Sequence, residues 1–328
     1  MLHFVKTEAE YQQALEETKK FPDFMLTYFT IENFVLKRFL EFELKVFSYK
    51  LPSGGKLWII ARFNVANRPY MIFGIDQNDK IDYENFKNAY DEVLTHMPNL
   101  YDNIPKAFLF VGVEQLFELY YKYMAEKFPN IKIVKEECNF FYSNEEQIEY
   151  LKNLHIELPE GYKFDKVDME KDLDTISDSW QYGVLGEKER TRAKLARLPY
   201  SLIREKSSGK PIAYELVDPS GYINHQYTCP EHRQKGLGNA VEMDVSRKCI
   251  DGYINHQYTC PEHRQKGLGN AVEMDVSRKC IEIGIVPNKT VSIKNTNFES
   301  SKRCPYWTLW EHNGNPVIFA YGIHEQRC

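Results

Sequence analysis

The sequence predicts an α/β (α+β) protein of two domains, 1–150 and 151–328. Three observations lead to this prediction. A length of 328 residues suits about two domains. Strand-like and helix-like segments alternate through both halves of the chain. A polar stretch, "SNEEQIEYLKNLHIELPEG" (143–161), lies between the halves. We therefore expect the boundary between the domains in that stretch.

The first half reads as strands followed by strand–helix alternation. Apolar and polar residues alternate over Phe42–Tyr49, and "LPSGG" then leads into Lys56–Phe63, which predicts a hairpin. Helical spacing places Phe86, Tyr90, Val93 and Met97 on one stripe. The other elements expected here are strands over Pro69–Ile75, Ala107–Val113 and within Asn130–Ser143, and helices over Ile81–Met97 and Glu114–Phe128.

The second half continues the alternation. Strands over Tyr200–Glu205 and Pro211–Val217 flank the turn "KSSGK", and "DPSG" (Asp218–Gly221) forms the next tight turn. We also expect a strand over Tyr162–Asp168, a helix over Met169–Trp180, a strand over Lys289–Lys294, a short polar helix and a last strand over Pro316–Ile323.

Composition excludes several classes of protein. The formal net charge is −5, which argues against a nucleic-acid partner. No stretch of about 18 apolar residues is present, so we expect no membrane span. The first twenty residues lack an apolar signal core and carry Glu8, Glu10, Glu16 and Glu17. Without the repeat described next, the cysteines occupy five positions with no framework spacing, so a cytoplasmic protein is expected.

A block of the second half occurs twice without a difference. Gly221–Ile250 is repeated as Gly252–Ile281, so the copies start 31 positions apart. Each copy reads as a strand, "GYINHQYTC", followed by a helix, "GLGNAVEMDVSRKCI". In copy one the helix would carry Leu237, Val241, Val245 and Cys249 on one stripe.

The loop "PEHRQKGLG" joins strand to helix in each copy. In copy one it brings Arg233, Lys235, Gly236 and Gly238 to the helix N-terminus. Unpaired N–H groups and the positive end of the helix dipole favour an anion there, and glycine lets a phosphate approach the backbone. The alternative is a glycine-containing turn with solvated basic residues. The dinucleotide fingerprint is excluded, because its third glycine would fall on Val241.

Taken in order, the motifs of the second half resemble the GNAT acyltransferase superfamily, and more narrowly its glycine N-acyltransferase-like branch. The matching motifs are "SWQYG", "SGKPIAYELVDPSG", "PEHRQKGLG", "SIKNTNF" and "CPYWTLW". The resemblance implies a mixed, splayed sheet flanked by helices, preceded by that branch's own N-terminal domain. It also implies transfer of an acyl group from acyl-CoA to a small-molecule amine or amino acid, and a mitochondrial location as the alternative to a cytoplasmic one.

The resemblance also implies which residues hold the cofactor. The loop would cradle the acyl-CoA pyrophosphate, and Asn297 at the start of the following helix would contact the cofactor, although an ordinary helix cap is the other reading of that asparagine. The loop residues are Arg233, Gln234, Lys235, Gly236, Leu237 and Gly238, or in the second copy Arg264, Gln265, Lys266, Gly267, Leu268 and Gly269.

The general base is where the sequence departs from the family. The glycine N-acyltransferases place a glutamate after the turn glycine, whereas this chain has Tyr222 there and Tyr253 in copy two. Tyrosine has a pKa of about 10, while a histidine near 6.5 is better matched to neutral pH. His225 is close in sequence, but strand alternation would put it on the opposite face from Tyr222. A packed histidine without a catalytic role is the other reading.

A zinc site is not expected. The duplication creates Cys229, His232, Cys260 and His263, but their separation follows from the 31-residue period. No metal is predicted.

One GNAT sheet has a single slot for its cofactor, so only one copy can serve it. We expect copy one to form the site, because its strand follows "DPSG" directly, with Gly252–Ile281 as a strained, partly displaced insert. The alternative is copy two, because its helix runs directly into "IEIGIVPNKTVSIK" and Asn297. The function predicted is an acyl-CoA-dependent N-acyltransferase. The missing glutamate leaves a catalytically weak or inactive acyl-CoA-binding protein as the alternative, and an interaction protein that binds no CoA as a third reading.

Overall fold

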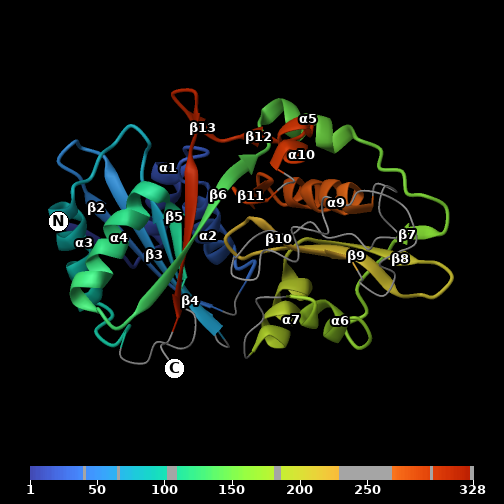
Figure 1. Ribbon diagram of the computed structural model, residues 1–328, viewed down its shortest axis with the longest axis horizontal. Helices are drawn as coiled ribbons and strands as arrows, with labels where there is room; N and C mark the ends of the chain where they lie inside the picture. Colours follow the sequence, from blue (N-terminus) through green and yellow to red (C-terminus); the bar gives the residue numbers. More distant parts are fainter. Residues whose placement is uncertain are drawn as a thin grey trace. The chain divides into compact units, whose positions relative to one another are not determined.

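The computed structural model describes residues 1–39, 42–64, 67–101, 109–180, 186–228, 268–295 and 298–325. Within these residues the chain forms a mixed α/β fold, which confirms the predicted fold class (Figure 1). Its contacts divide it into two compact units. Unit 1 comprises Met1–Cys138 and Glu311–Cys328, and unit 2 comprises Asn139–Trp310.

The sheet of unit 1 has the strand order β1-β2-β3-β4-β5-β15, and it continues from β15 to β6 (Lys132–Tyr142). The hairpin predicted from "LPSGG" is confirmed, since β2 and β3 pair antiparallel from Phe42 opposite Asn64 to Lys50 opposite Lys56. The strands are β1 (Leu2–Val5), β2 (Phe42–Lys50), β3 (Lys56–Asn64), β4 (Asn67–Gly74), β5 (Leu109–Val113) and β15 (Ile318–Glu325), with a small pair β13 (Glu311–His312) and β14 (Asn315–Pro316) before β15.

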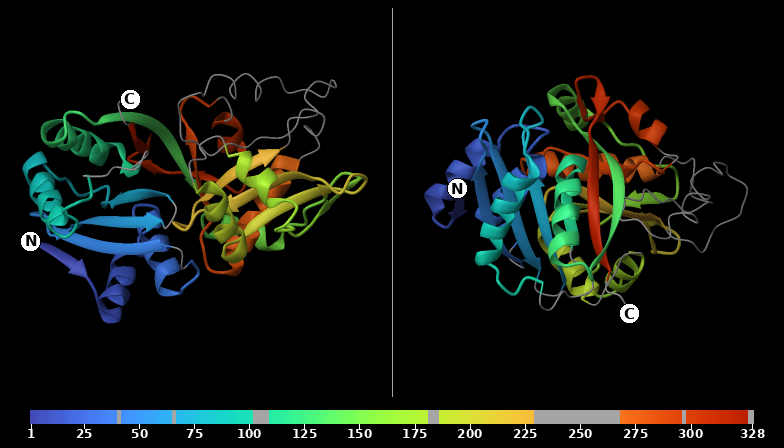
Figure 2. Two further views of the ribbon diagram at one scale, coloured as in Figure 1. Left: turned by 90° about the horizontal axis from the view of Figure 1, so that it is seen from below. Right: turned by 60° about the vertical axis from the view of Figure 1, so that its left-hand side comes forward.

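Helices cover both faces of this sheet. Figure 2 shows α1 and α2 on one face and α3 and α4 on the other. The stripe predicted for the helix after β4 is buried, with Phe86, Tyr90 and Val93 all at 0 % exposure. Asp82 begins that helix by accepting a hydrogen bond from the Asn85 backbone N–H. The helices are α1 (Glu8–Thr18), α2 (Met25–Val35), α3 (Tyr83–Thr95) and α4 (Glu114–Lys127).

The main sheet of unit 2 is antiparallel, in the order β10-β9-β8-β7. Each face packs on its own helices. On one face Leu202 and Tyr214 pack with Ile176 and Leu195 from α6 and α7. On the other, Ile203 and Ala213 pack with Leu268, Ala271 and Val272 from α9. The elements are β7 (Tyr162–Phe164), α6 (Leu173–Asp178), α7 (Glu187–Arg197), β8 (Tyr200–Glu205), β9 (Pro211–Val217), β10 (Ile223–Thr228) and α9 (Leu268–Glu282).

A second group of elements completes unit 2. Strand β6 begins in unit 1 and ends in unit 2, where its last residues pair with β12. β11 is the next strand beside β6. The elements are β6 (Lys132–Tyr142), α5 (Glu145–Asn153), β11 (Asn288–Ser292), α10 (Phe298–Arg303) and β12 (Thr308–Leu309).

The compact units differ from the domains 1–150 and 151–328 that the sequence predicts. The stretch expected to separate them contains helix α5, which begins with a capping box between Asn144 and Gln147. Gln147 also donates to the Pro305 carbonyl and accepts from Thr308 Oγ1, so the stretch is bound to unit 2. The last strand, β15, instead pairs with β5 of unit 1. Both differences arise from long-range contacts that local polarity does not report.

Candidate functional site

The described structure contains the strand of one copy of the repeated block and the helix of the other. Strand β10 (Ile223–Thr228) comes from copy one, and helix α9 (Leu268–Glu282) comes from copy two. The stripe predicted for the copy-one helix is found at the matching positions of copy two. Leu268, Val272, Val276 and Cys280 are all buried, at 1 % exposure or less.

The residues that flank the block explain this division. Before β10, Asp218 caps a tight turn by accepting from the backbone N–H groups of Ser220 and Gly221, and Gly221 has a φ of 81°. After α9, Gly284 has a φ of 82° and the Ile285 N–H donates to the Cys280 carbonyl. The first flank adjoins only the strand of copy one, and the second adjoins only the helix of copy two. Combining the strand of copy one with the helix of copy two therefore preserves both the turn before β10 and the helix terminus after α9.

This result revises the expectation that copy one supplies both the strand and the helix, with Gly252–Ile281 as a partly displaced insert. Leu268–Ile281 of that insert packs on the sheet as part of α9. The copy-one strand was expected to form a hairpin after the "DPSG" turn, and β10 pairs with β9 as expected. The helix of copy two runs directly into "IEIGIVPNKTVSIK", which is the sequence argument for copy two, and α9 agrees with it.

Most of the predicted cofactor residues lie outside the described residues. Among the loop positions, Leu268 and Gly269 are described; both are buried in the first turn of α9. The positions outside the described residues are Arg233, Gln234, Lys235, Gly236, Leu237, Gly238, Asn297, Arg264, Gln265, Lys266 and Gly267.

Strand β10 carries a bulge at its centre. Asn224 pairs with Leu216 and Tyr227 pairs with Tyr214, so His225 and Gln226 together oppose the single residue Glu215. His225 has a φ of 55°, in the left-handed region that residues other than glycine adopt uncommonly. The alternation that would place Tyr222 and His225 on opposite faces is interrupted at this point.

The His225 ring is fixed against helix α6. Its Nε2 atom lies 3.1 Å from Ser179 Oγ, and a hydrogen bond links the ring to the Ile176 backbone. The ring centroid is 4.6 Å from that of Trp180. Burial lowers the pKa of His225 well below its usual value, and the positive charges of Lys194 and Arg190 lower it further. The imidazole is therefore neutral at physiological pH.

The other predicted catalytic residue, Tyr222, lies in the turn before β10. Its side chain is buried, and its carbonyl accepts a hydrogen bond from the Asp218 N–H. The backbone contact closes the turn that leads into β10.

A buried ionic cluster lies on the α9 face of the sheet. Lys289 of β11 pairs with Glu273 of α9, and the Tyr306 hydroxyl donates to Glu273 Oε2 at 3.1 Å. Glu215, opposite the bulge, has its pKa raised well above the usual value by burial and by the negative charge of Glu273. The sequence pattern does not predict this cluster. The signal that could have indicated it is a charged residue at a position expected to be buried: Glu273 in the amphipathic helix and Lys289 in the short strand.

A second polar cluster joins α7 to the turn and strand of copy one. Lys194 Nζ lies 3.8 Å from Asp218 Oδ2 and 3.5 Å from Asn224 Oδ1, and all three side chains are buried. Arg190 pairs with Glu187 at 2.7 Å on the same helix. These contacts hold the start of β10 against α7, and they place positive charge near His225.

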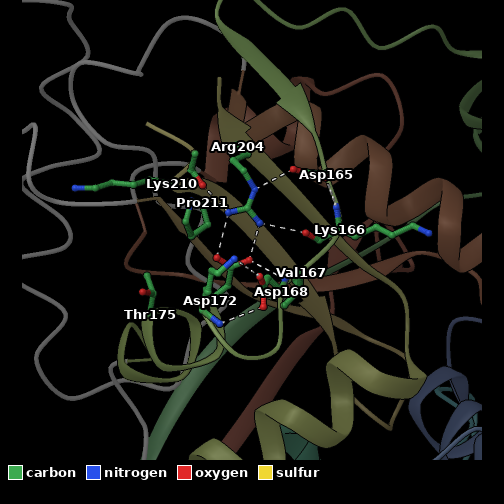
Figure 3. Close-up of a pocket in the computed structure, with 11 residues that line it drawn as sticks. Asp165, Lys166, Val167, Asp168, Asp172, Thr175, Arg204, Lys210 and Pro211 are labelled. Atoms are coloured by element: carbon green, nitrogen blue, oxygen red, sulfur yellow. Dashed lines mark hydrogen bonds and ion pairs between the residues drawn. The ribbon is translucent and has the colours of Figure 1, made fainter. Parts of the chain in front are cut away.

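An open pocket of about 710 Å³ lies where the β7–α6 connection meets the β8–β9 turn (Figure 3). Arg204 points into it and donates to Asp165 at 2.9 Å, to both oxygens of Asp172, and to the Lys166 and Gly209 carbonyls. These contacts use all five N–H groups of the guanidinium. Arg204 therefore ties the two loops together.

Two further properties concern only the described part of the chain. No helix there is long and apolar enough to cross a membrane. No group of three or more His, Cys, Asp or Glu side chains there is placed to hold a metal ion. Of the residues weighed for a zinc site, Cys229, His232, Cys260 and His263 lie outside the described residues.

Comparison with known proteins gives the fold. No family model and no curated protein matches the chain. A crystal structure of a Drosophila protein is similar over 98 % of this chain and 97 % of that chain, with a TM-score of 0.65 and 14 % identity. At that identity the likeness concerns the fold alone.

Other solved structures that the chain resembles are described as GNAT proteins. A GCN5-related N-acetyltransferase from Sphaerobacter thermophilus covers 100 % of this chain and 96 % of its own, with a TM-score of 0.49 and 10 % identity. A tandem GNAT protein from the clavulanic acid biosynthesis pathway covers 99 % and 98 %, with a TM-score of 0.47 and 11 % identity. TM-scores below 0.5 are too low to support a structural argument.

Proposed function

We propose that this protein is an acyl-CoA-dependent N-acyltransferase that acts on the amine of a small molecule or an amino acid, of the glycine N-acyltransferase-like type. The observation that supports it most directly is the bulge in β10, where His225 and Gln226 oppose one residue of β9. The bulge lies just before the connection from β10 to α9, and that connection contains the loop "PEHRQKGLG". The order of the motifs in the second half also supports the proposal.

The cofactor would be held at the N-terminus of α9. Because α9 belongs to copy two, we assign the pyrophosphate of acyl-CoA to Arg264–Gly269 and treat Arg233–Gly238 as the alternative. The first N–H groups of this 15-residue helix and the positive end of its dipole favour the diphosphate. Arg264 and Lys266 add positive charge, and Asn297 would contact the cofactor from the start of the next helix.

The reaction needs few groups from the protein. The amine nitrogen attacks the thioester carbon, a C–N bond forms and the C–S bond breaks. The nitrogen loses a proton, and the departing CoA thiolate takes one up. In an antiparallel bulge the extra residue leaves backbone groups without their ladder partners. A backbone N–H of β10 that is freed in this way would stabilise the developing oxyanion. Most of the rate would come from holding the amine beside the thioester.

The two residues that the sequence offers as the general base are poorly placed to accept a proton. Both Tyr222 and His225 are buried, and His225 has a lowered pKa. A buried imidazole of low pKa accepts a proton from an ammonium group only weakly. This observation favours the second candidate function, a protein that binds acyl-CoA and transfers the acyl group slowly or not at all.

Two measurements separate these functions. The purified protein is incubated with acetyl-, benzoyl- and longer acyl-CoA and a panel of amines, and free thiol is measured. The proposed function requires thiol release that depends on the amine. Calorimetric binding of acyl-CoA without thiol release would support the binding protein instead, and the absence of both would exclude both functions.

The two copies provide matched variants for the cofactor loop. We expect Gly267→Val to abolish CoA binding, because a branched side chain would block the approach of a phosphate to the start of α9. Gly236→Val, the same change in copy one, should leave the Kd for CoA within about two-fold. Isothermal titration calorimetry checks both. If Gly236→Val alone abolishes binding, the cofactor is bound by copy one.

A further inference from the structure

The bulge in β10 is held in an unfavourable backbone conformation. His225, at its centre, has a φ of 55° although it is not glycine, and it faces the interior at 1 % exposure. A left-handed residue of this kind persists only where the surroundings stabilise it. The contacts of the side chain therefore decide whether the bulge is retained.

Those contacts come from the last turn of α6 and from β9. The Ser179 hydroxyl donates to the Ile176 carbonyl at 2.7 Å and lies 3.1 Å from His225 Nε2. The Tyr214 hydroxyl donates to Ser179 Oγ at 2.6 Å. Ser179, which caps the C-terminus of α6, thus links that helix to Tyr214 on β9 and to His225 on β10.

The ring is also held by packing. The Trp180 ring lies against it with centroids 4.6 Å apart, and the Tyr214 ring meets it edge-on at 6.0 Å. His225 is therefore bound on one side by hydrogen bonds and packed on another by aromatic rings. The residues that supply the hydroxyl and backbone groups around the ring, Ile176, Ser179 and Tyr214, lie outside the repeated block.

We propose that His225 is a positioning residue. Its ring, anchored through Ser179 and Tyr214, fixes the bulge of β10 and so fixes the backbone groups that face the reacting thioester. The proposal rests on the acyltransferase function proposed above. It assigns no proton transfer to His225. Ser179 and Tyr214 are then positioning residues too, because they act through the histidine.

The test uses Ser179→Ala and Tyr214→Phe, which remove one hydroxyl each. The second copy cannot bypass them, because neither residue belongs to the repeated block. We expect kcat to fall by about ten-fold or more while the KM for acyl-CoA stays within about two-fold, because misplacement affects the transition state more than binding. Ser179→Thr keeps the hydroxyl and should retain most of the wild-type kcat.

The histidine itself is tested with His225→Asn, since asparagine tolerates the left-handed conformation but lacks the ring. The matched control is His256→Asn, the same change in copy two, which should alter neither kcat nor Tm. The double variant, His225→Asn with His256→Asn, prevents the chain from using the second copy. We expect its Tm loss and that of Ser179→Ala to be non-additive when they are combined, because both remove one network.

The outcomes separate this proposal from the function. Unchanged kcat in folded Ser179→Ala, or additive Tm losses in the combined variant, would overturn the positioning role. A wild-type protein without turnover but with non-additive Tm losses would keep the anchor and exclude the acyltransferase. If Ser179→Thr fails to restore kcat while matching the wild-type Tm, the hydroxyl is not the anchor and the proposal fails.

Discussion

At the scale of single residues, His324 is a buried base that links stability to pH. It lies on β15, 2 % exposed, with Nε2 2.7 Å from the Tyr120 hydroxyl. Burial lowers its pKa to about 3 from the usual value of 6.5. Between these values the unfolded chain binds a proton that the folded chain does not. Stability is therefore complete above pH 6.5 and falls as the pH drops toward 3.

This linkage gives a prediction for His324→Gln, which keeps a polar partner for Tyr120 but does not titrate. The wild type should lose about 2 kcal/mol more than the variant in the free energy of unfolding between pH 6.5 and pH 5. The measurement is urea unfolding across that range. His225 is shared by both proteins, so its own titration cancels in the difference. Parallel curves would show that His324 is not buried as a neutral base.

A second residue-scale prediction concerns the Lys289–Glu273 pair. Both side chains are buried, and removing one partner of a buried pair leaves the other charge without its closest counter-charge. Glu273→Gln should therefore lower the free energy of unfolding by about 3 kcal/mol. The matched variant Glu242→Gln changes the same residue in copy one and should cost less than about 0.5 kcal/mol. Chemical denaturation compares them, and the reverse order would mean that the copy-one helix packs on the sheet.

At the scale of elements, local pattern predicts those segments whose buried face is apolar. The hairpin of β2 and β3, the stripes of α3 and α9, and the strands β8 and β9 follow from periodicity, and the structure confirms them. Helix α7 could not be found in this way. Its sequence is "EKERTRAKLAR", and three of its four buried side chains are polar: Glu187, Thr191 and Lys194. That face packs against Asp218 and Asn224, partners that become visible only once the chain is folded.

The same reasoning applies to the candidate site. The "DPSG" turn, the strand and the helix N-terminus could be predicted, because turn residues and amphipathic spacing are local signals. The left-handed conformation of His225 could not, because it follows from the register that β10 adopts against β9 and from the contact with Ser179. The ionic cluster around Glu273 joins residues of three elements, which local sequence does not bring together.

At the scale of the whole molecule, the duplication raises the question of what the surplus residues cost. Removing residues 221–251, 229–259 or 251–281 gives one and the same sequence, because the copies are identical. The single-copy protein keeps the Asp218 turn before its strand and the Gly284 terminus after its helix. It also shortens the connection between β10 and α9 from 229–267 to 229–236.

We expect this deletion to stabilise the protein. The connection becomes less than a quarter of its original length, which should recover about 1.3 kcal/mol of loop-closure entropy. For a unit of this size that corresponds to a rise in Tm of about 3–5 °C. Differential scanning calorimetry of the two proteins measures the change, and CoA titration of both shows whether one copy of the loop suffices for binding. A single-copy protein with a lower Tm would mean that the additional residues make stabilising contacts of their own, and that the second copy is an integral part of the fold.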